Sequence, residues 1–322
     1  MNTKATVGLG TFPFANPFTP IDEEEVKKVI LAFLEMGARY IETVPVYASG
    51  ETESMIGRIL KNLKRERYFL SDMCGLALDE SGQFKRSGKY NDVIASCNAS
   101  LSRLGIDYFD LYISHSPDVN TPFQETIGAM VELKRQGKTR ELGVSNVSLE
   151  QLKDYNATGH VKWVENRFSL LNRSLSPEFI GYCQEHGIGI IAFQVIERGL
   201  LTEKSVQGIT LREGDLRAKK SEFAAGTRDV IEAWVRTSLK PISDDLGVSL
   251  PALAIWWAMQ QPSIAVCLTG ATKEEQIRKS LEALKFVPPA GTINRVEESY
   301  AALANQIEQA HSTSVRSFMG LD

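Results

Sequence analysis

Short apolar runs alternate with longer amphipathic segments along most of the chain. The run at 187–193 is almost unbroken in its apolar character, which is typical of parallel strands buried on both faces. The segment at 22–36 instead places Val26, Ile30 and Phe33 on one helical face and opens with an acidic turn that suits the helix dipole. The pattern therefore predicts strands that alternate with helices.

Eight such strand and helix units can be counted. The strands are expected at 6–11, 40–44, 68–73, 109–114, 140–144, 161–165, 187–193 and 264–268. The helices are expected at 22–36, 51–63, 90–104, 121–136, 149–155, 176–185, 229–246, 250–260 and 273–284. Strict alternation requires parallel strands with right-handed crossovers, and eight units close into a (β/α)8 TIM barrel.

Three stretches fall outside this regular pattern. A polar loop is expected at 77–89, a long polar segment at 202–228, and a tail after Pro288 that carries an additional C-terminal helix at 294–309. No interdomain linker is recognisable, so we expect residues 1–322 to form one barrel domain. The segments at about 202–228 and 288–322 are expected to shape the substrate site.

Composition narrows the possible partners of this barrel. The chain has 322 residues, is 43% hydrophobic and carries a net charge of −4 without a basic cluster, which argues against nucleic acid or a membrane surface as a partner. No apolar run reaches the roughly 18 residues that a membrane span needs, and no secretory leader is recognisable. The cysteines are far apart, without metal-ligand spacing, at Cys74, Cys97, Cys183 and Cys267. We therefore expect a cytoplasmic protein with reduced thiols and without a metal.

Candidate chemistry is found by asking what stands at the end of each predicted strand. In such barrels, ligands bind over the carboxyl ends of the strands. Tyr47 follows the second strand and His115 ends the fourth, and these two residue types together indicate acid–base chemistry. The other strand ends supply Thr11, Glu42, Met73, Ser145, Asn146, Glu165, Phe193, Gln194 and Thr272.

A set of short motifs gives the chain a resemblance to a known family. The motifs are Gly8-Leu-Gly-Thr11, the stretch 37–50 around Tyr47, Asp110-Leu-Tyr-Ile-Ser-His115, Leu142-Gly-Val-Ser-Asn146, Arg198-Gly-Leu-Leu201, Gly214-Asp-Leu-Arg217 and Thr269-Gly-Ala-Thr-Lys-Glu-Glu-Gln276. In combination they resemble the aldo-keto reductases, in the branch related to potassium-channel β subunits and bacterial aldehyde reductases. The resemblance runs from about residue 7 to residue 284.

The resemblance implies reduction of aldehydes and ketones with NADPH through a tyrosine, a lysine, an aspartate and a histidine. Tyr47 matches the tyrosine and His115 the histidine. Glu42 stands in the place of the aspartate and Met73 in the place of the lysine. Two of the four catalytic positions therefore depart from the family pattern.

The resemblance also implies a binding site for NADP(H). Ser145 and Asn146 match the pair that holds the nicotinamide carboxamide, Glu165 replaces a glutamine beside them, and Phe193 matches the aromatic ring that stacks on the nicotinamide. The remaining implied positions are Thr11, Gln194, Gly199 and Arg217 near the pyrophosphate, and Thr272, Lys273 and Gln276 near the adenosine 2′-phosphate. The residues usually found on the adenine are replaced by Lys279 and Ser280.

The departures change what the site can do. A free tyrosine has a pKa near 10, and a neighbouring lysine lowers it, which methionine cannot do. Without that cation, Glu42 is expected to have a raised pKa or a new donor, and a hydrogen-bonded cluster of Glu42, Tyr47 and His115 is our hypothesis.

Three functional interpretations stay open at this point. The protein is an NADP(H)-dependent oxidoreductase of a carbonyl or hydroxyl group, or a redox-neutral proton-transfer enzyme such as an isomerase or lyase, or a nucleotide-binding regulatory protein with little turnover. A smaller and more polar wall at Ser116, where the family usually has tryptophan, is compatible with a polar substrate.

Overall fold

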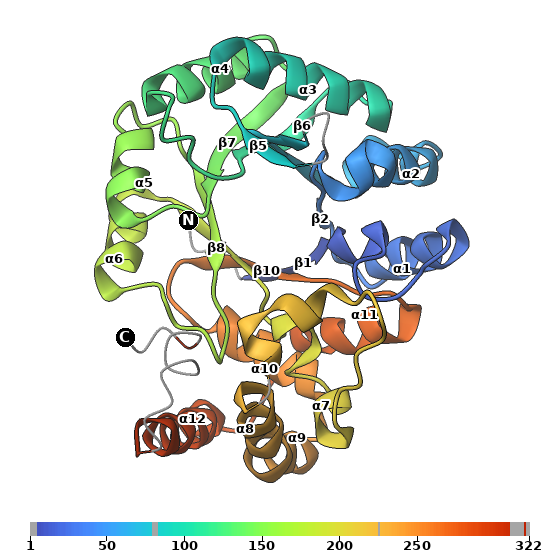
Figure 1. The fold of residues 1–322 in the computed structure, drawn as a ribbon, viewed down its shortest axis with the longest axis vertical. Helices are drawn as coiled ribbons and strands as arrows, with labels where there is room; N and C mark the ends of the chain where they lie inside the picture. Colours follow the sequence, from blue (N-terminus) through green and yellow to red (C-terminus); the bar gives the residue numbers. More distant parts are fainter. Residues whose placement is uncertain (1–4, 79–82, 225, 310–318, 320–322) are drawn as a thin grey trace.

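Eight parallel strands close into a barrel at the centre of the molecule (Figure 1). The computed structural model describes residues 5–78, 83–224, 226–309 and 319. Around the barrel the order is β1, β2, β3, β6, β7, β8, β9, β10, and β10 pairs with β1 to close it. The strand bounds are β1 Thr6–Gly10, β2 Tyr40–Glu42, β3 Phe69–Cys74, β6 Phe109–Ser114, β7 Thr139–Ser145, β8 Trp163–Arg167, β9 Gly189–Phe193 and β10 Ile264–Thr269. The predicted (β/α)8 barrel is confirmed.

Helices surround the barrel and cover the outer face of its strands (Figure 1). The α-helices are α1 Glu23–Glu35, α2 Glu51–Leu60, α3 Tyr90–Leu104, α4 Phe123–Arg135, α5 Leu149–Tyr155, α6 Pro177–His186, α7 Glu203–Gln207, α8 Thr227–Trp234, α9 Lys240–Asp245, α10 Leu250–Met259, α11 Glu274–Leu281 and α12 Thr292–Gln309. Short 3-10 turns occur at η1 Phe12–Ala15, η2 Tyr47–Gly50, η3 Arg65–Arg67, η4 Glu197–Gly199, η5 Leu216–Lys219, η6 Ser221–Phe223 and η8 Glu282–Leu284.

Helix α1 shows how the sequence pattern produces this arrangement. The Asp22 side chain caps its first turn by accepting a hydrogen bond from the backbone N–H of Glu25 at 2.9 Å. Val26, Ile30 and Phe33 have no exposed surface, so the apolar face that the sequence predicts is buried against the barrel.

The strands bury both of their faces, in two separate clusters. Side chains that point into the barrel form a compact interior cluster, whose buried members are Tyr40, Val44, Met73, Leu111, Ile113, Ile191, Val266 and Leu268. Side chains that point outward join the larger core under the helices. Gly8 also points inward, and an added Cβ there would lie 2.7 Å from Leu268, so the interior is filled and is not a pore.

Two stretches differ from the sequence prediction. The predicted loop at 77–89 contains a hairpin of β4 Leu76–Leu78 and β5 Phe84–Arg86, although residues 79–82 lie outside the described part of the chain. The single helix predicted at 229–246 is divided into α8, a π-helical turn η7 Val235–Leu239, and α9. Pro241 has no backbone N–H for the regular helical bond, which accounts for the interruption at this point.

The C-terminal helix α12 lies outside the ring of barrel helices, beside α8 (Figure 1). The indole N–H of Trp234 in α8 donates to the backbone carbonyl of Ser299 in α12 at 3.0 Å. Helix α10, which is apolar on all sides and almost fully buried, lies between this outer layer and the barrel. Residues 310–318 and 320–322 of the predicted tail are outside the described residues, so the role expected for 288–322 stays a prediction, as does the extent of the single domain.

Candidate active site

The carboxyl ends of the barrel strands carry the candidate residues from the sequence. Glu42 ends β2, Tyr47 opens η2 directly after it, and Met73 lies near the end of β3. His115 follows β6, and its backbone N–H continues the pairing with β3 through the carbonyl of Cys74 at 2.9 Å. The remaining candidates lie at the ends of β1, β7, β8, β9 and β10 or in the segments that follow them: Thr11, Ser145, Asn146, Glu165, Phe193, Gln194, Gly199, Arg217, Thr272, Lys273 and Gln276.

Glu42 and Tyr47 contact each other at the mouth of the barrel. The Tyr47 hydroxyl donates to Glu42 Oε1 at 3.4 Å, and the tyrosine ring packs on Phe12 with centroids 5.2 Å apart. Burial raises the pKa of Glu42 from 4.5 to about 7, although its hydrogen bond with Tyr47 opposes this rise. Burial and the charge of Glu42 raise the pKa of Tyr47 well above 10. The phenol therefore holds its proton, and the carboxylate beside it titrates near neutrality.

Met73 supplies no charge to this pair. Its side chain is 1% exposed and belongs to the interior cluster, so it faces the same side of the strands as Glu42. The adjacent Asp72 points outward, and its carboxylate accepts a hydrogen bond from the Met73 backbone N–H at 2.6 Å. The barrel interior beneath Tyr47 is accordingly apolar.

Glu165 places a second carboxylate at the mouth. Its strand neighbour Val164 belongs to the outer core and Trp163 packs on the interior cluster, so Glu165 shares the inward face with Trp163. It is 5% exposed, and its Oε2 has no hydrogen-bond partner. Burial, with the charge of Glu42, raises the pKa of Glu165 well above its usual range. The two glutamates therefore influence each other's ionisation.

His115 does not join the cluster that the sequence suggested. Among the described residues no hydrogen bond links it to Glu42 or Tyr47, and its Nδ1 is buried without a partner. Burial, with the charge of Arg86 as a second cause, lowers the pKa of His115 from 6.5 to about 4. The imidazole is neutral at physiological pH, and it remains available as a hydrogen-bonding group.

Sequence reasoning missed Arg86, which the unpredicted hairpin brings toward His115. Its Nε donates to Ser116 Oγ at 3.1 Å. Arg86, Ser116 and Asn146 line a hollow of about 460 Å³ beside the strand ends, together with Pro117, Asp118, Val119, Asn120 and Gln151. A short apolar run, turn-forming residues and a second run at 76–86 were the available hairpin signal.

The positions expected to bind a nicotinamide lie along neighbouring strand ends. Asn146 donates from its side chain to the His115 carbonyl at 2.9 Å and to Ser145 Oγ at 3.0 Å. Phe193 packs on the interior cluster at the end of β9, and the side-chain oxygen of Gln194 is buried without a partner.

The positions expected near the nucleotide phosphates lie beyond β9 and β10. Gln276 in α11 accepts a hydrogen bond from the Thr272 backbone N–H at 2.9 Å, which shapes the turn before this helix. Lys273 caps α11 through its backbone and takes part in none of the ion pairs found within the described residues. Arg217 is paired with Asp215 at 2.7 Å and faces Gly199. Thr11 has a buried hydroxyl oxygen without a partner.

The segment at 208–224 crosses from β9 toward β1 and is called the strap below. The backbone N–H of Leu216 donates to the carbonyl of Pro17 at 3.0 Å, and Arg212 donates to the carbonyl of Phe18. In the barrel, β10 lies between β9, which the strap follows in the chain, and β1, whose following segment the strap contacts.

Backbone conformations of high energy gather at the same end. Ala48, Ser49, Asn146, Gln194, Glu197 and Arg198 all have φ between 45° and 58° without being glycine. Such residues cost of the order of 1 kcal/mol each and tend to occur at functional sites. Their distribution supports the carboxyl end as the functional face.

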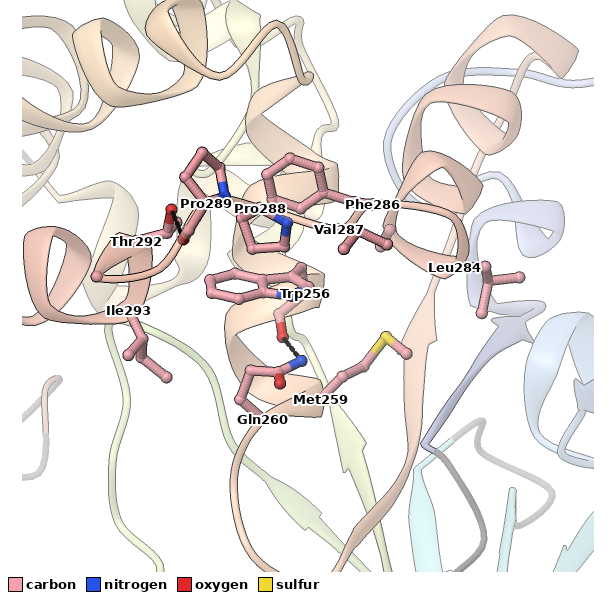
Figure 2. Close-up of a pocket in the computed structure, with 12 residues that line it drawn as sticks. Trp256, Met259, Gln260, Leu284, Phe286, Val287, Pro288, Pro289, Thr292 and Ile293 are labelled. Carbon is pink, nitrogen blue, oxygen red and sulfur yellow. Dashed lines mark hydrogen bonds between the residues drawn. The ribbon is translucent and has the colours of Figure 1, made fainter.

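The molecule has a second hollow, which lies on its flank. Figure 2 shows it between α10 and the segment before α12, with Trp256, Phe286 and Pro288 around it. None of the candidate residues lines it. It is separate from the barrel mouth and carries no titratable group.

Neither a metal cluster nor a membrane-spanning helix occurs within the described ranges. No group of three or more His, Cys, Asp or Glu side chains there is arranged to hold a metal ion. No helix there is long and apolar enough to cross a bilayer.

Comparison with known proteins agrees with this architecture. The profile of the Aldo/keto reductase family matches residues 6–301. The chain is 30% identical over 306 residues to the NADH-specific methylglyoxal reductase of Escherichia coli, covering 88% of this chain and 91% of that protein. It is 27% identical over 277 residues to a probable voltage-gated potassium channel subunit beta of Arabidopsis thaliana, covering 83% and 84%.

A solved structure supports the same assignment. The glycerol dehydrogenase of Gluconobacter oxydans superposes with a TM-score of 0.82 at 25% identity, covering 94% of this chain and 93% of that one. The family match spans nearly the whole barrel, and both named bacterial relatives are oxidoreductases. The chain belongs to the aldo/keto reductase family.

Proposed function

We propose that the protein is an NADP(H)-dependent oxidoreductase that acts on a carbonyl or hydroxyl group of a small, polar substrate. The observation that carries this proposal is the pairing of Tyr47 with Glu42 at the carboxyl end of the barrel. The neighbouring strand ends present Ser145, Asn146 and Phe193 where a nicotinamide would lie. A proton donor and a hydride-donor site then share one mouth.

The residues present fit a nicotinamide nucleotide. Gln194 offers a buried, unpartnered oxygen to a donor group, and Phe193 offers a ring face at the mouth. Lys273 supplies a cation beside the first turn of α11, which suits a phosphate. When bound, such a cofactor supplies or accepts the hydride; the chain itself holds the substrate and moves the proton.

The proton path runs from Glu42 through Tyr47. Because the pKa of Glu42 is about 7, a large share of this carboxyl group carries a proton near neutral pH. Tyr47 can give its hydroxyl proton to the substrate oxygen while Glu42 replaces it along the 3.4 Å hydrogen bond. Neutral His115 orients the substrate oxygen by donating a hydrogen bond and adds no charge.

Two other functions are supported by single observations. A redox-neutral isomerase or lyase is favoured by the same Glu42, since a carboxylate with a pKa near 7 is a suitable general base. A nucleotide-binding regulatory role is favoured by the similarity to a plant channel subunit. Both interpretations predict little hydride transfer, whereas the proposed oxidoreductase transfers a hydride in every turnover.

The first experiment is a fluorescence titration of the purified protein with NADPH and, in parallel, with NADH. We expect saturable binding of NADPH, and we expect Lys273→Met to weaken NADPH binding about tenfold while NADH is unaffected. The E. coli relative is named as NADH-specific, so the parallel titration also decides which nucleotide this chain prefers. Failure to bind either nucleotide would exclude the oxidoreductase.

The second experiment separates the three functions by turnover. A panel of aldehydes, ketones and keto-sugars is incubated with the protein and the bound nucleotide, and the consumption of NADPH is recorded. Turnover that is lost in Tyr47→Phe supports the proposal. Nucleotide binding without consumption supports the regulatory role, and rearranged product without consumption supports the isomerase.

The substrate is expected to be polar because of the hollow beside His115. Ser116, Arg86 and Asn146 line it with a hydroxyl, a guanidinium and an amide. We further propose a cytoplasmic location without nucleic-acid or membrane partners, on the basis of the −4 net charge spread along the chain.

A further inference from the structure

The charge balance at the mouth is unusual for a site that should polarise a carbonyl. The resemblance to reductases implies an aspartate, a lysine and a glutamine, whose formal charges cancel. This chain has Glu42, Met73 and Glu165 at those positions. One cation has been lost and one carboxyl group has been gained.

Both carboxyl groups face the same enclosed space. Glu42 is 4% exposed and Glu165 5% exposed, and both lie on the inward face at the ends of their strands. The Glu42 carboxylate lies against the backbone of β1, where an added Cβ on Gly10 would be only 3.3 Å from Oε2. The Oε2 atom of Glu165 is buried without any hydrogen-bond partner.

Arg86 carries a positive charge beside His115, but neither it nor any other described cation lowers the pKa of Glu42 or Glu165. Neither glutamate takes part in an ion pair among the described residues, whereas some other buried carboxylates do, such as Glu53 with Arg103 at 2.6 Å. Asp72, which points away from the mouth, is also buried without an ion pair. His115 is neutral and Tyr47 is a phenol. A buried carboxylate pair without a cation is costly, and proteins retain such pairs when a ligand completes them.

We infer that Glu42 and Glu165 together bind a cationic nitrogen of the substrate, at the carbon that exchanges the hydride, so that the substrate class is a protonated imine or the amine formed from it. This inference rests on the nucleotide-dependent hydride transfer of the proposed function, and at that same site it puts a C=N bond in place of the C=O bond. The substrate would then supply the positive charge that a lysine supplies in other reductases.

The reaction balances without a further reagent. Glu42 gives its proton to the nitrogen of a neutral imine, which leaves a carboxylate facing an iminium ion. A hydride from the reduced nicotinamide forms the new C–H bond, the π pair of the C=N bond moves onto nitrogen, and the nicotinamide is oxidised. No proton has to reach an oxygen, so the missing lysine is not needed.

The test compares two probes with the same number of heavy atoms. N-methyl-1-pyrrolinium carries a charge that does not depend on pH, and cyclopentanone is neutral. Binding to the full-length protein is measured by calorimetry at pH 8, with and without saturating NADPH. We expect the cation to bind at least tenfold more tightly than the ketone.

Variants locate the origin of this preference. Glu165→Gln and Glu42→Gln each keep the side-chain size, and each is expected to weaken binding of the cation about tenfold while cyclopentanone is unchanged. Glu150→Gln removes a charge from an exposed position at the start of α5 and should change neither affinity. Thermal unfolding confirms that each variant is folded. Equal affinity for both probes, or a preference that survives both glutamine variants, overturns the inference.

Failure of the inference and failure of the proposed function are distinguishable. Absence of nucleotide binding removes the proposed function, whatever the probes do. Nucleotide binding with reduction of cyclopentanone but not of the pyrrolinium keeps the proposed function and overturns the inference. Transfer of deuterium from 4-deuterated NADPH to the pyrrolinium carbon supports both.

Discussion

Two pairs of buried carboxylates lie at the same end of the barrel, and only one of them is neutralised by arginine side chains. Glu197 and Glu222, which are 0% and 2% exposed, are neutralised by Arg167 and Arg198. Arg167 contacts Glu197 at 2.5 Å and Glu222 at 3.6 Å. Glu42 and Glu165 are about as deeply buried but have no cation.

The difference indicates which pair is structural. The first pair joins the ends of β8 and β9 to the end of the strap. Each of its carboxylates forms an ion pair with an arginine of the same chain. Burial raises the pKa of Glu197 as well, but Arg167 opposes that rise, whereas no described cation opposes it for Glu42 or Glu165. One oxygen of Glu165 also has no hydrogen-bond partner. A cluster complete by itself stabilises the fold, whereas an incomplete one is poised for a ligand.

The largest expected effect is the loss of a cation from the neutralised pair. Arg167→Met leaves Glu197 buried with Ser169 but without its arginine, and we expect a loss of about 3 kcal/mol in the free energy of unfolding. Urea denaturation measures it. Arg135→Met, on the exposed end of α4, serves as the control and should change stability by less than about 0.5 kcal/mol. Equal stability of the two variants would contradict the assignment.

The next effect comes from removing a charge from the unneutralised pair. The pKa of Glu42 in the folded protein, about 7, lies above 4.5, so the folded state binds more protons than the unfolded chain between these pH values. Stability therefore falls as pH rises through this window. Glu42→Gln should raise the free energy of unfolding by about 3 kcal/mol at pH 8 and change it little at pH 4. A gain that is the same at both pH values would show that ionisation is not its cause.

A smaller effect is expected when the second pair is given a cation. Met73→Lys combined with Glu42→Asp rebuilds the charges expected in the family, and it should raise the reduction of simple aldehydes at least tenfold. Met73→Leu conserves the apolar volume and should leave the rate unchanged. Steady-state kinetics with a neutral aldehyde compare the two variants. If the double variant shows no gain in rate, other residues of the mouth account for the departure from ordinary aldehyde reduction.

The smallest effect concerns His115. Removal of the Arg86 charge, as in Arg86→Gln, should raise the pKa of His115 above its value of about 4, but only partly toward 6.5, because burial is the larger cause. An NMR titration of the histidine ring protons measures this directly. A pKa that does not move would mean that burial alone holds the imidazole neutral.

The sequence predicts the barrel well because its strands and helices are locally consistent. The ranges expected for β6, α3 and α5 match the structure, since each has a clear period or cap, such as Ser148 at the start of α5. The hairpin at 76–86 was missed because its strands are only three residues long. The π-turn η7 depends on Pro241 within an otherwise continuous helical pattern.

The site was only partly predictable, for a different reason. Strand ends can be identified from sequence, so Glu42, Tyr47, Glu165 and His115 were found. Which of them interact depends on the direction of each side chain across the barrel, and this is fixed by register. Glu42 contacts Tyr47, has no hydrogen bond with His115 among the described residues, and affects Glu165 through its charge. Arg86 lay in a stretch expected to be irregular.

The strap has a kinetic consequence. Because Leu216 and Arg212 fasten it to Pro17 and Phe18, release of the proposed nucleotide from the neighbouring strand ends would require those hydrogen bonds to break. Its residence time would then be set by how often the strap opens and not by its affinity alone. Substrate would exchange many times during one nucleotide's stay, and under saturating conditions the opening of the strap, rather than hydride transfer, would limit the steady-state rate.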